Sequence, residues 1–163
     1  MNINDIRKPG MPKGDWEFIL KHLKPTFIMF EWGAGGSTTF FSYFVKILYS
    51  IEHENFWFVN TINAIEKEKR GNIILYWVPA PEDNYTTYVN KIDDLKHIDF
   101  DVVLIDGRAR VECAKKLLGY IRDDCIVFLH DAERKRYEEI FNYYTIIDRT
   151  NTLCMLKKNG KNK

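Results

Sequence analysis

Short apolar runs and amphipathic segments alternate along most of this 163-residue chain. Five of the runs are apolar at nearly every position, which is typical of parallel strands buried on both faces of a sheet. The segments between them carry apolar residues three or four positions apart and therefore predict helices. The five predicted strands are residues 26–31, 47–51, 73–78, 101–106 and 125–129.

Two further apolar runs, residues 144–148 and 152–156, close the chain and are joined by only three residues. A parallel crossover needs a dozen or more residues, so this pair is predicted to form an antiparallel hairpin. Alternating strands and helices predict an α/β fold: a doubly wound, mostly parallel seven-stranded sheet with a C-terminal antiparallel hairpin and helices on both faces. The predicted helices are residues 16–23, 40–45, 55–69, 85–95, 109–121 and 133–143.

The length and composition fit one domain over residues 1–163, without a linker or an internal repeat. Apolar residues make up 45% of the chain, which is enough for a well-filled core. The polar, proline-containing residues 1–13 predict an N-terminal arm that lies over the body of the protein. Residues 157–163 predict a frayed basic tail.

Charge and cysteine content narrow the class of protein further. A net charge of +1 gives no global field that would attract nucleic acid or an anionic membrane. The apolar stretches are too short to cross a bilayer, and the polar N-terminal segment does not resemble a signal peptide. Cys113, Cys125 and Cys154 are widely spaced and fit neither a disulfide framework nor a zinc site. We therefore expect a soluble, cytoplasmic protein with reduced cysteines. The sequence does not indicate its oligomeric state.

Polar residues gather directly after the predicted strands, where an open α/β sheet binds its ligands. The first strand ends at Glu31 and leads into the glycine loop Gly33-Ala34-Gly35-Gly36, whose backbone can approach a ligand closely. Ser37 or Thr38 can cap the helix that follows. The polar groups after the other strands are Glu52-His53, Pro81-Glu82-Asp83, Asp106-Gly107-Arg108 and His130-Asp131.

One interpretation of the glycine loop is a dinucleotide-binding fingerprint. Gly33 and Gly35 match its first two glycines, and Glu52 follows at a distance suited to a ribose. Thr38, however, stands in the place of the third glycine, and the chain is too short for a substrate domain. A nucleotide-dependent oxidoreductase is therefore an alternative that fits the sequence less well.

A second interpretation fits better. The segment Glu31-Trp32-Gly33-Ala34-Gly35-Gly36-Ser37-Thr38 resembles the E/D-x-G-x-G-x-S/T motif of class I S-adenosylmethionine-dependent methyltransferases. The order of elements from Trp16 to Leu156 is similar to their Rossmann-like seven-stranded sheet. The resemblance implies a methyltransferase that uses S-adenosylmethionine as its cofactor.

The resemblance also implies roles for individual residues. Gly33 and Gly35 would let the backbone pass close to the methionine part of the cofactor, and Glu31 would bond the loop or the amino group. Glu52 would accept both ribose hydroxyls, because a carboxylate offers two acceptor oxygens. The implied cofactor-binding residues are Glu31, Gly33, Ala34, Gly35, Ser37, Thr38, Glu52, His53, Pro81, Asp106 and Gly107.

The segments at residues 103–111 and 129–131 resemble a subgroup of small bacterial, algal and viral proteins, some of which act on glycans. The implied reaction is O-methylation of a sugar or glycan hydroxyl, with a small-molecule or glycan acceptor and no nucleic acid. Methyl transfer to oxygen needs a group that takes the hydroxyl proton. His130 is a natural base because its ordinary pKa lies near neutral pH. Asp131 or Asp106 could serve instead, or could orient the histidine.

Catechol-type O-methyltransferases place a magnesium ion between an acid after strand four and an acid–amide pair after strand five. Asp106 and Asp131 fall at comparable positions, so Mg²⁺ or Mn²⁺ could bind them. The pair His130-Asp131 departs from the acid–amide pattern, and metal dependence is therefore not the favoured hypothesis.

The remaining candidates concern the acceptor. Arg108 could bind a carboxylate or phosphate of the acceptor or cofactor, or could pair with Glu82, Asp83 or Asp131. Arg110 is predicted to lie on a helix surface. Trp16 could stack on a sugar in the acceptor pocket, or could pack in the core. A non-catalytic cofactor-binding or scaffold protein with the same fold is a further alternative.

Overall fold

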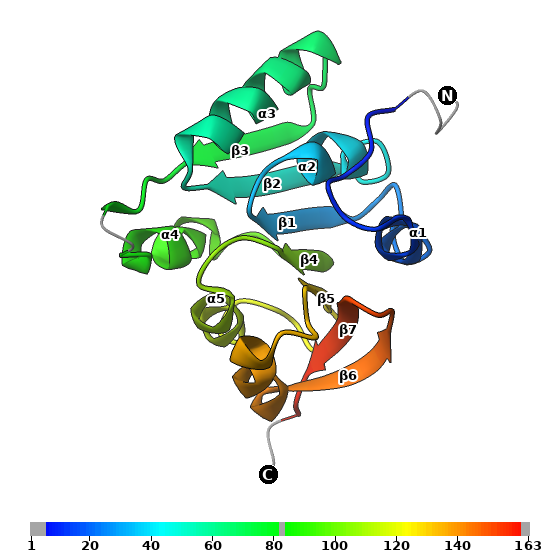
Figure 1. Ribbon diagram of the computed structural model, residues 1–163, viewed down its shortest axis with the longest axis vertical. Helices are drawn as coiled ribbons and strands as arrows, with labels where there is room; N and C mark the ends of the chain where they lie inside the picture. Colours follow the sequence, from blue (N-terminus) through cyan, green and yellow to red (C-terminus); the bar gives the residue numbers. More distant parts are fainter. Residues whose placement is uncertain (1–5, 82–83, 161–163) are drawn as a thin grey trace.

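A seven-stranded sheet forms the centre of the computed structural model, which describes residues 6–81 and 84–160. Its strand order is β3-β2-β1-β4-β5-β7-β6 (Figure 1), and β1 to β5 pair in parallel. The parallel strands are β1 (Ile28–Trp32), β2 (Ile47–Glu52), β3 (Ile73–Trp77), β4 (Val102–Ile105) and β5 (Ile126–His130). The doubly wound, mostly parallel sheet predicted from the sequence is confirmed.

The last two strands, β6 (Tyr144–Arg149) and β7 (Leu153–Lys158), form the predicted antiparallel hairpin. Strand β7 also pairs antiparallel with β5. The strand order reverses between β1 and β4, which makes their carboxyl ends the topological switch point of the sheet. The glycine loop after β1 and Asp106 after β4 therefore emerge side by side.

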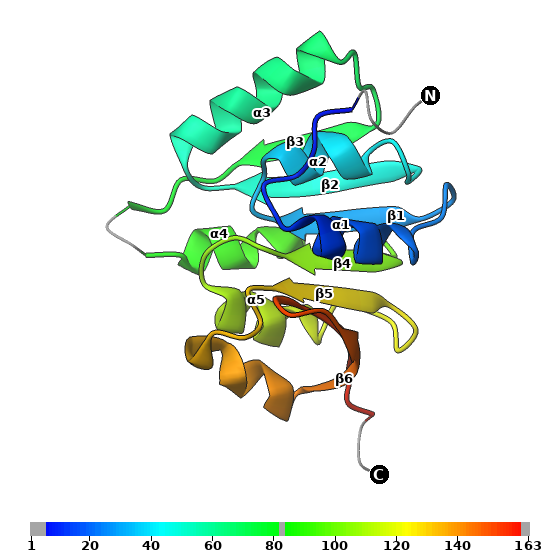
Figure 2. The ribbon, with the colours of Figure 1, turned by 45° about the vertical axis from the view of Figure 1, so that its right-hand side comes forward.

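Helices cover both faces of the sheet because the central strands are apolar on both sides. In β4, Val102 and Leu104 pack with α1 and α2, whereas Val103 and Ile105 pack with α5. Figure 2 shows α1 lying over β1 and β4. The helices are α1 (Lys13–Leu20), α2 (Gly36–Phe41), α3 (Asn55–Lys67), α4 (Thr86–Asn90) and α5 (Arg110–Leu117), with 3-10 segments η3 (Lys91–Leu95) and η4 (Lys135–Asn142).

Several predicted helix boundaries are wrong. Helix α1 begins three residues early, at Lys13, and α2 lies largely before the predicted segment. The predicted helix at residues 133–143 is a 3-10 segment instead. Its buried side chains Tyr137 and Ile140 are three positions apart, which matches the three residues per turn of a 3-10 helix.

The two chain ends also differ from the prediction. Lys157 and Lys158 belong to β7, and Lys158 donates a hydrogen bond to the carbonyl of Ile121, so these two lysines are not part of a frayed tail. At the other end, Ile6 and Met11 are buried against the core, and Lys13 already belongs to α1. Residues 1–5 and 161–163 lie outside the described part of the chain. None of the described helices is long and apolar enough to span a membrane.

Candidate functional site

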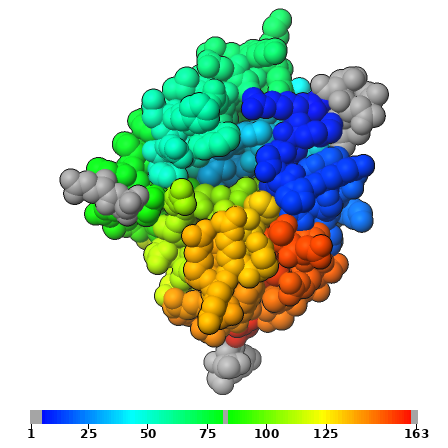
Figure 3. Space-filling view, in the orientation of Figure 1, coloured from blue at the N-terminus to red at the C-terminus, as the bar shows by residue number. Residues whose placement is uncertain are grey.

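A cavity of about 410 Å³ opens at the switch point, beyond the carboxyl ends of the parallel strands. Its size lies within the range of small-molecule sites. The lining residues come from the N-terminal segment, the glycine loop, the ends of β2 and β4 and the segment after β5. In Figure 3 these segments meet on the face in view, the first in blue, the loop in cyan and the last in yellow-orange.

The glycine loop presses directly against the turn after β4. Gly33 has a φ of 98°, and a Cβ added to it would lie 2.7 Å from the Cα of Gly107. A Cβ on Gly107 would in turn meet the hydroxyl of Tyr88 at 2.1 Å. Both glycines line the cavity. The close approach of Gly107 requires a glycine at position 33, and the Tyr88 hydroxyl requires one at position 107.

Glu31 holds the glycine loop from behind. Its buried carboxylate accepts hydrogen bonds from the hydroxyls of Ser37, Thr38 (2.7 Å) and Ser50 (2.9 Å). The Thr38 hydroxyl also accepts a hydrogen bond from the Gly35 N–H at 3.0 Å. Burial raises the pKa of Glu31 to about 7, because desolvation outweighs the three hydroxyl donors. Ser37 lines the cavity, whereas Glu31 and Thr38 lie behind its wall.

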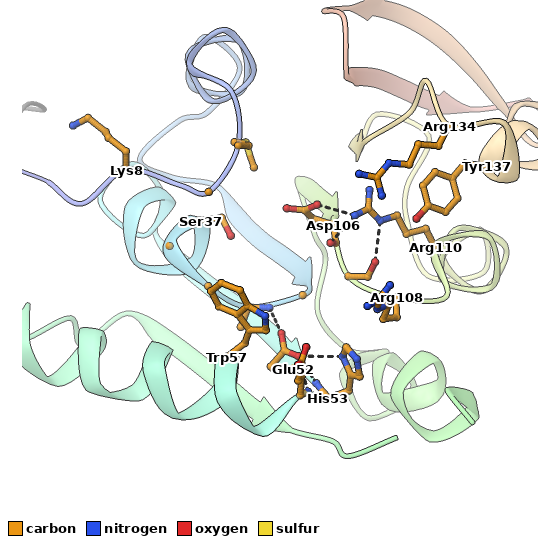
Figure 4. Close-up of a pocket in the computed structure, with 18 of the residues that line it drawn as sticks. Lys8, Ser37, Glu52, His53, Trp57, Asp106, Arg108, Arg110, Arg134 and Tyr137 are labelled. Carbon is orange, nitrogen blue, oxygen red and sulfur yellow. Dashed lines mark hydrogen bonds and ion pairs between the residues drawn. The ribbon is translucent and has the colours of Figure 1, made fainter. Parts of the chain in front are cut away.

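Glu52 joins the end of β2 to the glycine loop. Its Oε2 accepts a hydrogen bond from the Ala34 N–H at 2.8 Å. Its Oε1 accepts from the backbone N–H groups of His53 (2.8 Å) and Glu54 (2.7 Å). Each carboxylate oxygen has two acceptor positions, so Oε1 is filled and Oε2 keeps one position for a ligand. Figure 4 shows Glu52 at the cavity, beside Trp57 and His53.

His53 lines the cavity next to Glu52. Its ring packs against the rings of Tyr85 and Tyr88, with centroids 5.3 and 5.1 Å apart. Its Nδ1 lies 3.0 Å from Glu52 Oε1, but the two atoms are not aligned for a hydrogen bond. This buried nitrogen therefore has no hydrogen-bond partner among the described residues.

Arg110 connects the residues after β4 with those after β5, on the side of the cavity across from Glu52. The prediction that Arg110 lies on a helix surface is wrong. Its guanidinium is 6% exposed and contacts the carboxylates of Asp106 and Asp131, each at 3.0 Å. It also donates hydrogen bonds to the carbonyls of Asp106, Gly107 and His130. The preceding Ala109 has a left-handed φ of 49° at the start of α5. The side chain of Arg110 consequently reaches back over the strand ends.

His130 is buried between two carboxylates. Its Nδ1 lies 2.8 Å from Asp106 Oδ1, and its Nε2 lies 3.4 Å from Asp15 Oδ2. Burial lowers the pKa of His130, but the hydrogen bond to Asp106 and the charges of Asp106 and Asp131 outweigh it and raise the pKa above its ordinary value. Of the three predicted catalytic residues, only Asp106 lines the cavity.

The carboxylates do not form a ready metal site. Asp106, His130 and Asp131 each offer a ligand atom, and these atoms lie within 4.8 Å of one another. The guanidinium of Arg110 already contacts both carboxylates. A divalent cation bound by these atoms would lie close to the guanidinium of Arg110 and would be repelled by it.

Other predicted residues fall in different places. Trp16 is buried in the core, edge-on to Phe40 with ring centroids 5.3 Å apart, and is not among the residues that line the cavity. Pro81 is exposed and lies outside the cavity lining. Arg108 is exposed and lines the cavity. Two of the acids proposed to pair with Arg108, Glu82 and Asp83, lie outside the described residues.

Several cavity residues were missed by the sequence interpretation. Arg134 and Arg136 line the cavity from a charge-dense segment that is most simply interpreted as a solvated helix face. Their position two and four residues beyond Ala132, directly after a strand end, was a signal that could have identified them. Arg7 and Lys8 reach the cavity because the N-terminal segment crosses the glycine loop.

Neither a protein-family model nor a curated protein sequence matches the chain. Solved structures do match its fold. A methyltransferase-like protein from Silicibacter pomeroyi has a TM-score of 0.78 and 18% identity, covering 94% of this chain and 89% of that one. A precorrin-6y C5,15-methyltransferase from Geobacter metallireducens has a TM-score of 0.67 and 15% identity, covering 97% and 95%.

A candidate methyltransferase from Streptococcus mutans, in complex with SAH, has a TM-score of 0.67 and 14% identity, covering 91% of this chain and 100% of that one. An rRNA methylase from Streptococcus thermophilus is also among the matches. The chain therefore has the Rossmann-like fold of class I methyltransferases, as its glycine loop predicts. At these identities the likeness shows the fold alone, and proteins with unrelated acceptors share it.

Proposed function

We propose that this chain binds S-adenosylmethionine in the cavity and transfers its methyl group to an acceptor, a sugar or glycan hydroxyl in the more specific form. The observation that carries the proposal is the bond from the Ala34 N–H to Glu52. This bond fixes the acid at the end of β2 against the glycine loop at the switch point. The class I fold and the cavity volume support the same cofactor.

The cofactor fits the polar groups on the β1–β2 side. Glu52 Oε2 would accept one ribose hydroxyl at its remaining acceptor position, which revises the prediction that Glu52 accepts both. His53 lines the same side of the cavity and would lie beside the adenosine. Trp57, 43% exposed at the cavity, offers a flat face to the adenine. The backbone of residues 33–35 and the hydroxyl of Ser37 would hold the methionine part.

When bound, S-adenosylmethionine supplies a methyl group that is already activated on a sulfonium. The protein then has to position the acceptor hydroxyl and receive its proton. Of the predicted catalytic residues, only Asp106 lines the cavity. We therefore assign Asp106 as the base that accepts the proton of the acceptor hydroxyl. Arg110 and His130 both contact Oδ1 of Asp106, so they orient this carboxylate. His130 is accordingly a positioning residue in this proposal.

The sugar acceptor is supported by the resemblance of the segments after β4 and β5 to proteins that act on glycans. Labelled methyl transfer to a panel of glycans and nucleotide sugars, with and without Mg²⁺ and with a chelator, tests it. We expect transfer to at least one member of the panel and no loss of activity with the chelator. Transfer that depends on added Mg²⁺ would contradict the assignment of Arg110 as the cation between the two carboxylates.

A non-catalytic cofactor-binding protein is the second candidate, because His130 and Asp131 do not line the cavity. It predicts that S-adenosylhomocysteine (SAH) binds while no acceptor is methylated. The oxidoreductase alternative predicts instead that a nicotinamide dinucleotide binds and SAH does not. Thermal shift with each ligand separates the two, because a ligand that binds only the folded state raises the melting temperature.

A further inference from the structure

Positive charge is concentrated in the cavity although the chain as a whole is nearly neutral. The chain has 24 lysines and arginines against 23 acids. The cavity lining has six basic residues against three acidic ones. Two of those three acids, Glu52 and Glu54, lie at the end of β2, on the side proposed for the ribose. The excess of positive charge therefore lies elsewhere in the cavity.

The excess is carried by three exposed arginines after β4 and β5, which we call the arginine cluster: Arg108, Arg134 and Arg136. Arg134 shares the carboxylate of Asp131 with the buried Arg110. Neither Arg108 nor Arg136 has a carboxylate within ion-pair distance in the part of the chain that the structure describes. Arg134 also lies 3.9 Å from Glu133, and Arg110 also contacts Asp106. Among the described residues, Arg108 and Arg136 are therefore the cluster members without an acidic partner.

The cluster lies on one wall of the cavity, across Asp106 from the proposed cofactor side. Figure 4 shows Arg108, Arg110 and Arg134 on that wall, with Glu52 and Trp57 opposite. Tyr137 connects two arginines of this wall, because the guanidinium carbons of Arg110 and Arg136 lie 5.1 and 5.0 Å from its ring centroid.

The N-terminal cations belong to the other side. The carbonyl of Lys8 lies 3.0 Å from the place of a Cβ on Gly36, so Arg7 and Lys8 accompany the glycine loop. The ammonium of Lys8 donates a hydrogen bond to the carbonyl of Ile6 at 3.0 Å and lies over the ring of Phe40, 5.5 Å from its centroid. The arginine cluster, by contrast, lies beside Asp106, where the acceptor hydroxyl would stand.

We propose that the acceptor carries a phosphate or carboxylate group, which the arginine cluster binds while a neighbouring hydroxyl faces Asp106. This inference rests on the proposed function of the cavity. Guanidinium groups match both anions through paired N–H donors, so the shared chemistry is an oxyanion next to the methylated hydroxyl. Arg110 compensates the charge of Asp106, which lets an anionic acceptor approach that carboxylate.

The test compares a neutral hexose, the corresponding uronic acid and the corresponding hexose phosphate as acceptors for labelled methyl transfer by the full chain. We expect kcat/KM to be at least about tenfold higher for an anionic acceptor than for the neutral one, since a hydrogen bond to a charged group contributes that much discrimination. The uronic acid and the hexose phosphate distinguish a carboxylate from a phosphate requirement. Equal kcat/KM for all three acceptors would overturn the inference.

Variants separate the acceptor from the cofactor. Arg108→Gln and Arg136→Gln should each raise KM for the anionic acceptor about tenfold and leave the affinity for SAH unchanged. Lys135→Gln is the matched control, because Lys135 is an exposed cation between two cluster residues and does not line the cavity. Weaker SAH binding in the arginine variants would show that the cluster serves the cofactor and would contradict the inference.

Direct binding gives a readout that does not depend on turnover. Chemical-shift titration of the SAH-loaded protein with the hexose phosphate, the uronic acid and the neutral hexose should show saturable binding of an anionic sugar only. Failure of all three to bind while SAH binds would overturn the inference but leave the cofactor proposal intact. Failure of SAH itself to bind would contradict the proposed function, and the same titrations on the unloaded protein would then decide whether the cluster binds anions.

Discussion

The two sides of the cavity are held in place by different kinds of interaction. On the β1–β2 side, the carboxylates of Glu31 and Glu52 accept hydrogen bonds from hydroxyls and backbone N–H groups no more than nineteen residues away. On the β4–β5 side, Arg110 joins Asp106 to Asp131, and His130 lies between Asp106 and the distant Asp15. The β1–β2 side is thus held by hydrogen bonds between residues close in sequence. The β4–β5 side is held by an ion-pair network between separate elements.

The two sides should differ in how much stability they lose when a single side chain is removed. Glu31 and Glu52 accept hydrogen bonds from uncharged hydroxyl and backbone N–H groups, so the loss of one donor leaves no unpaired positive charge behind. When a buried arginine that serves two acids is removed, both acids lose a cationic partner. Asp131 then keeps the exposed Arg134, and Asp106 keeps His130. The β4–β5 side should therefore lose more stability from a single charge deletion than the β1–β2 side.

The largest effect is expected for Arg110→Met. Removing the guanidinium leaves Asp106 and Asp131 facing each other without their shared cation, which we expect to lower the free energy of unfolding by about 3 kcal/mol. Methyl transfer should be lost while SAH still binds. Urea unfolding and SAH calorimetry measure the two effects. Lys115→Met is the control, because Lys115 forms an exposed pair with Glu139 and its loss should matter far less.

The next effect concerns the contact between the two sides. Gly33→Ala adds a methyl group 2.7 Å from the Cα of Gly107 at a left-handed φ, and we expect it to cost about 2 to 3 kcal/mol of stability. Gly71→Ala is the control, since a Cβ there has nothing within 4 Å. Equal unfolding midpoints for the two variants would show that the loops can separate without cost.

A smaller, pH-dependent effect belongs to the β1–β2 side. Because burial raises the pKa of Glu31 to about 7, its contribution to stability is fully present below the unfolded pKa of 4.5 and is lost as the pH rises through 7. Between pH 5 and pH 8, the wild type should lose about 2 kcal/mol relative to Glu31→Gln. Urea unfolding of both proteins at the two pH values measures this difference. Parallel pH dependence in the two proteins would contradict the raised pKa.

The same comparison explains what could be predicted from the sequence. Glu31, Gly33 and Glu52 interact through short loops, so a local motif was sufficient to predict that they lie close together. Arg110 was misplaced on a helix surface, because nothing in the local pattern shows the left-handed Ala109 that turns the chain. The partner of Arg110 across the network, Asp131, follows a different strand, and only the fold brings the two together.

Long-range packing also accounts for the other errors. Trp16 carries the aromatic surface expected of a sugar-stacking residue, but α1 lies over β1 and β4 and buries it against Phe40. The arginines after β5 stand in a segment whose charge density suggests solvent on all sides. Their place directly after a strand end was the one sequence signal, and the strand order, with β5 next to β4, puts them beside the cavity.

The central claim is that the glycine loop and Glu52 form a cofactor site, and calorimetric titration with SAH tests it most directly. We predict saturable binding to the wild type and about tenfold weaker binding to Glu52→Gln, since the amide keeps the shape but loses a charge-assisted acceptor. Lys135→Gln should bind SAH as the wild type does. Absence of binding at millimolar SAH, or equal affinity in the wild type and Glu52→Gln, would contradict the account.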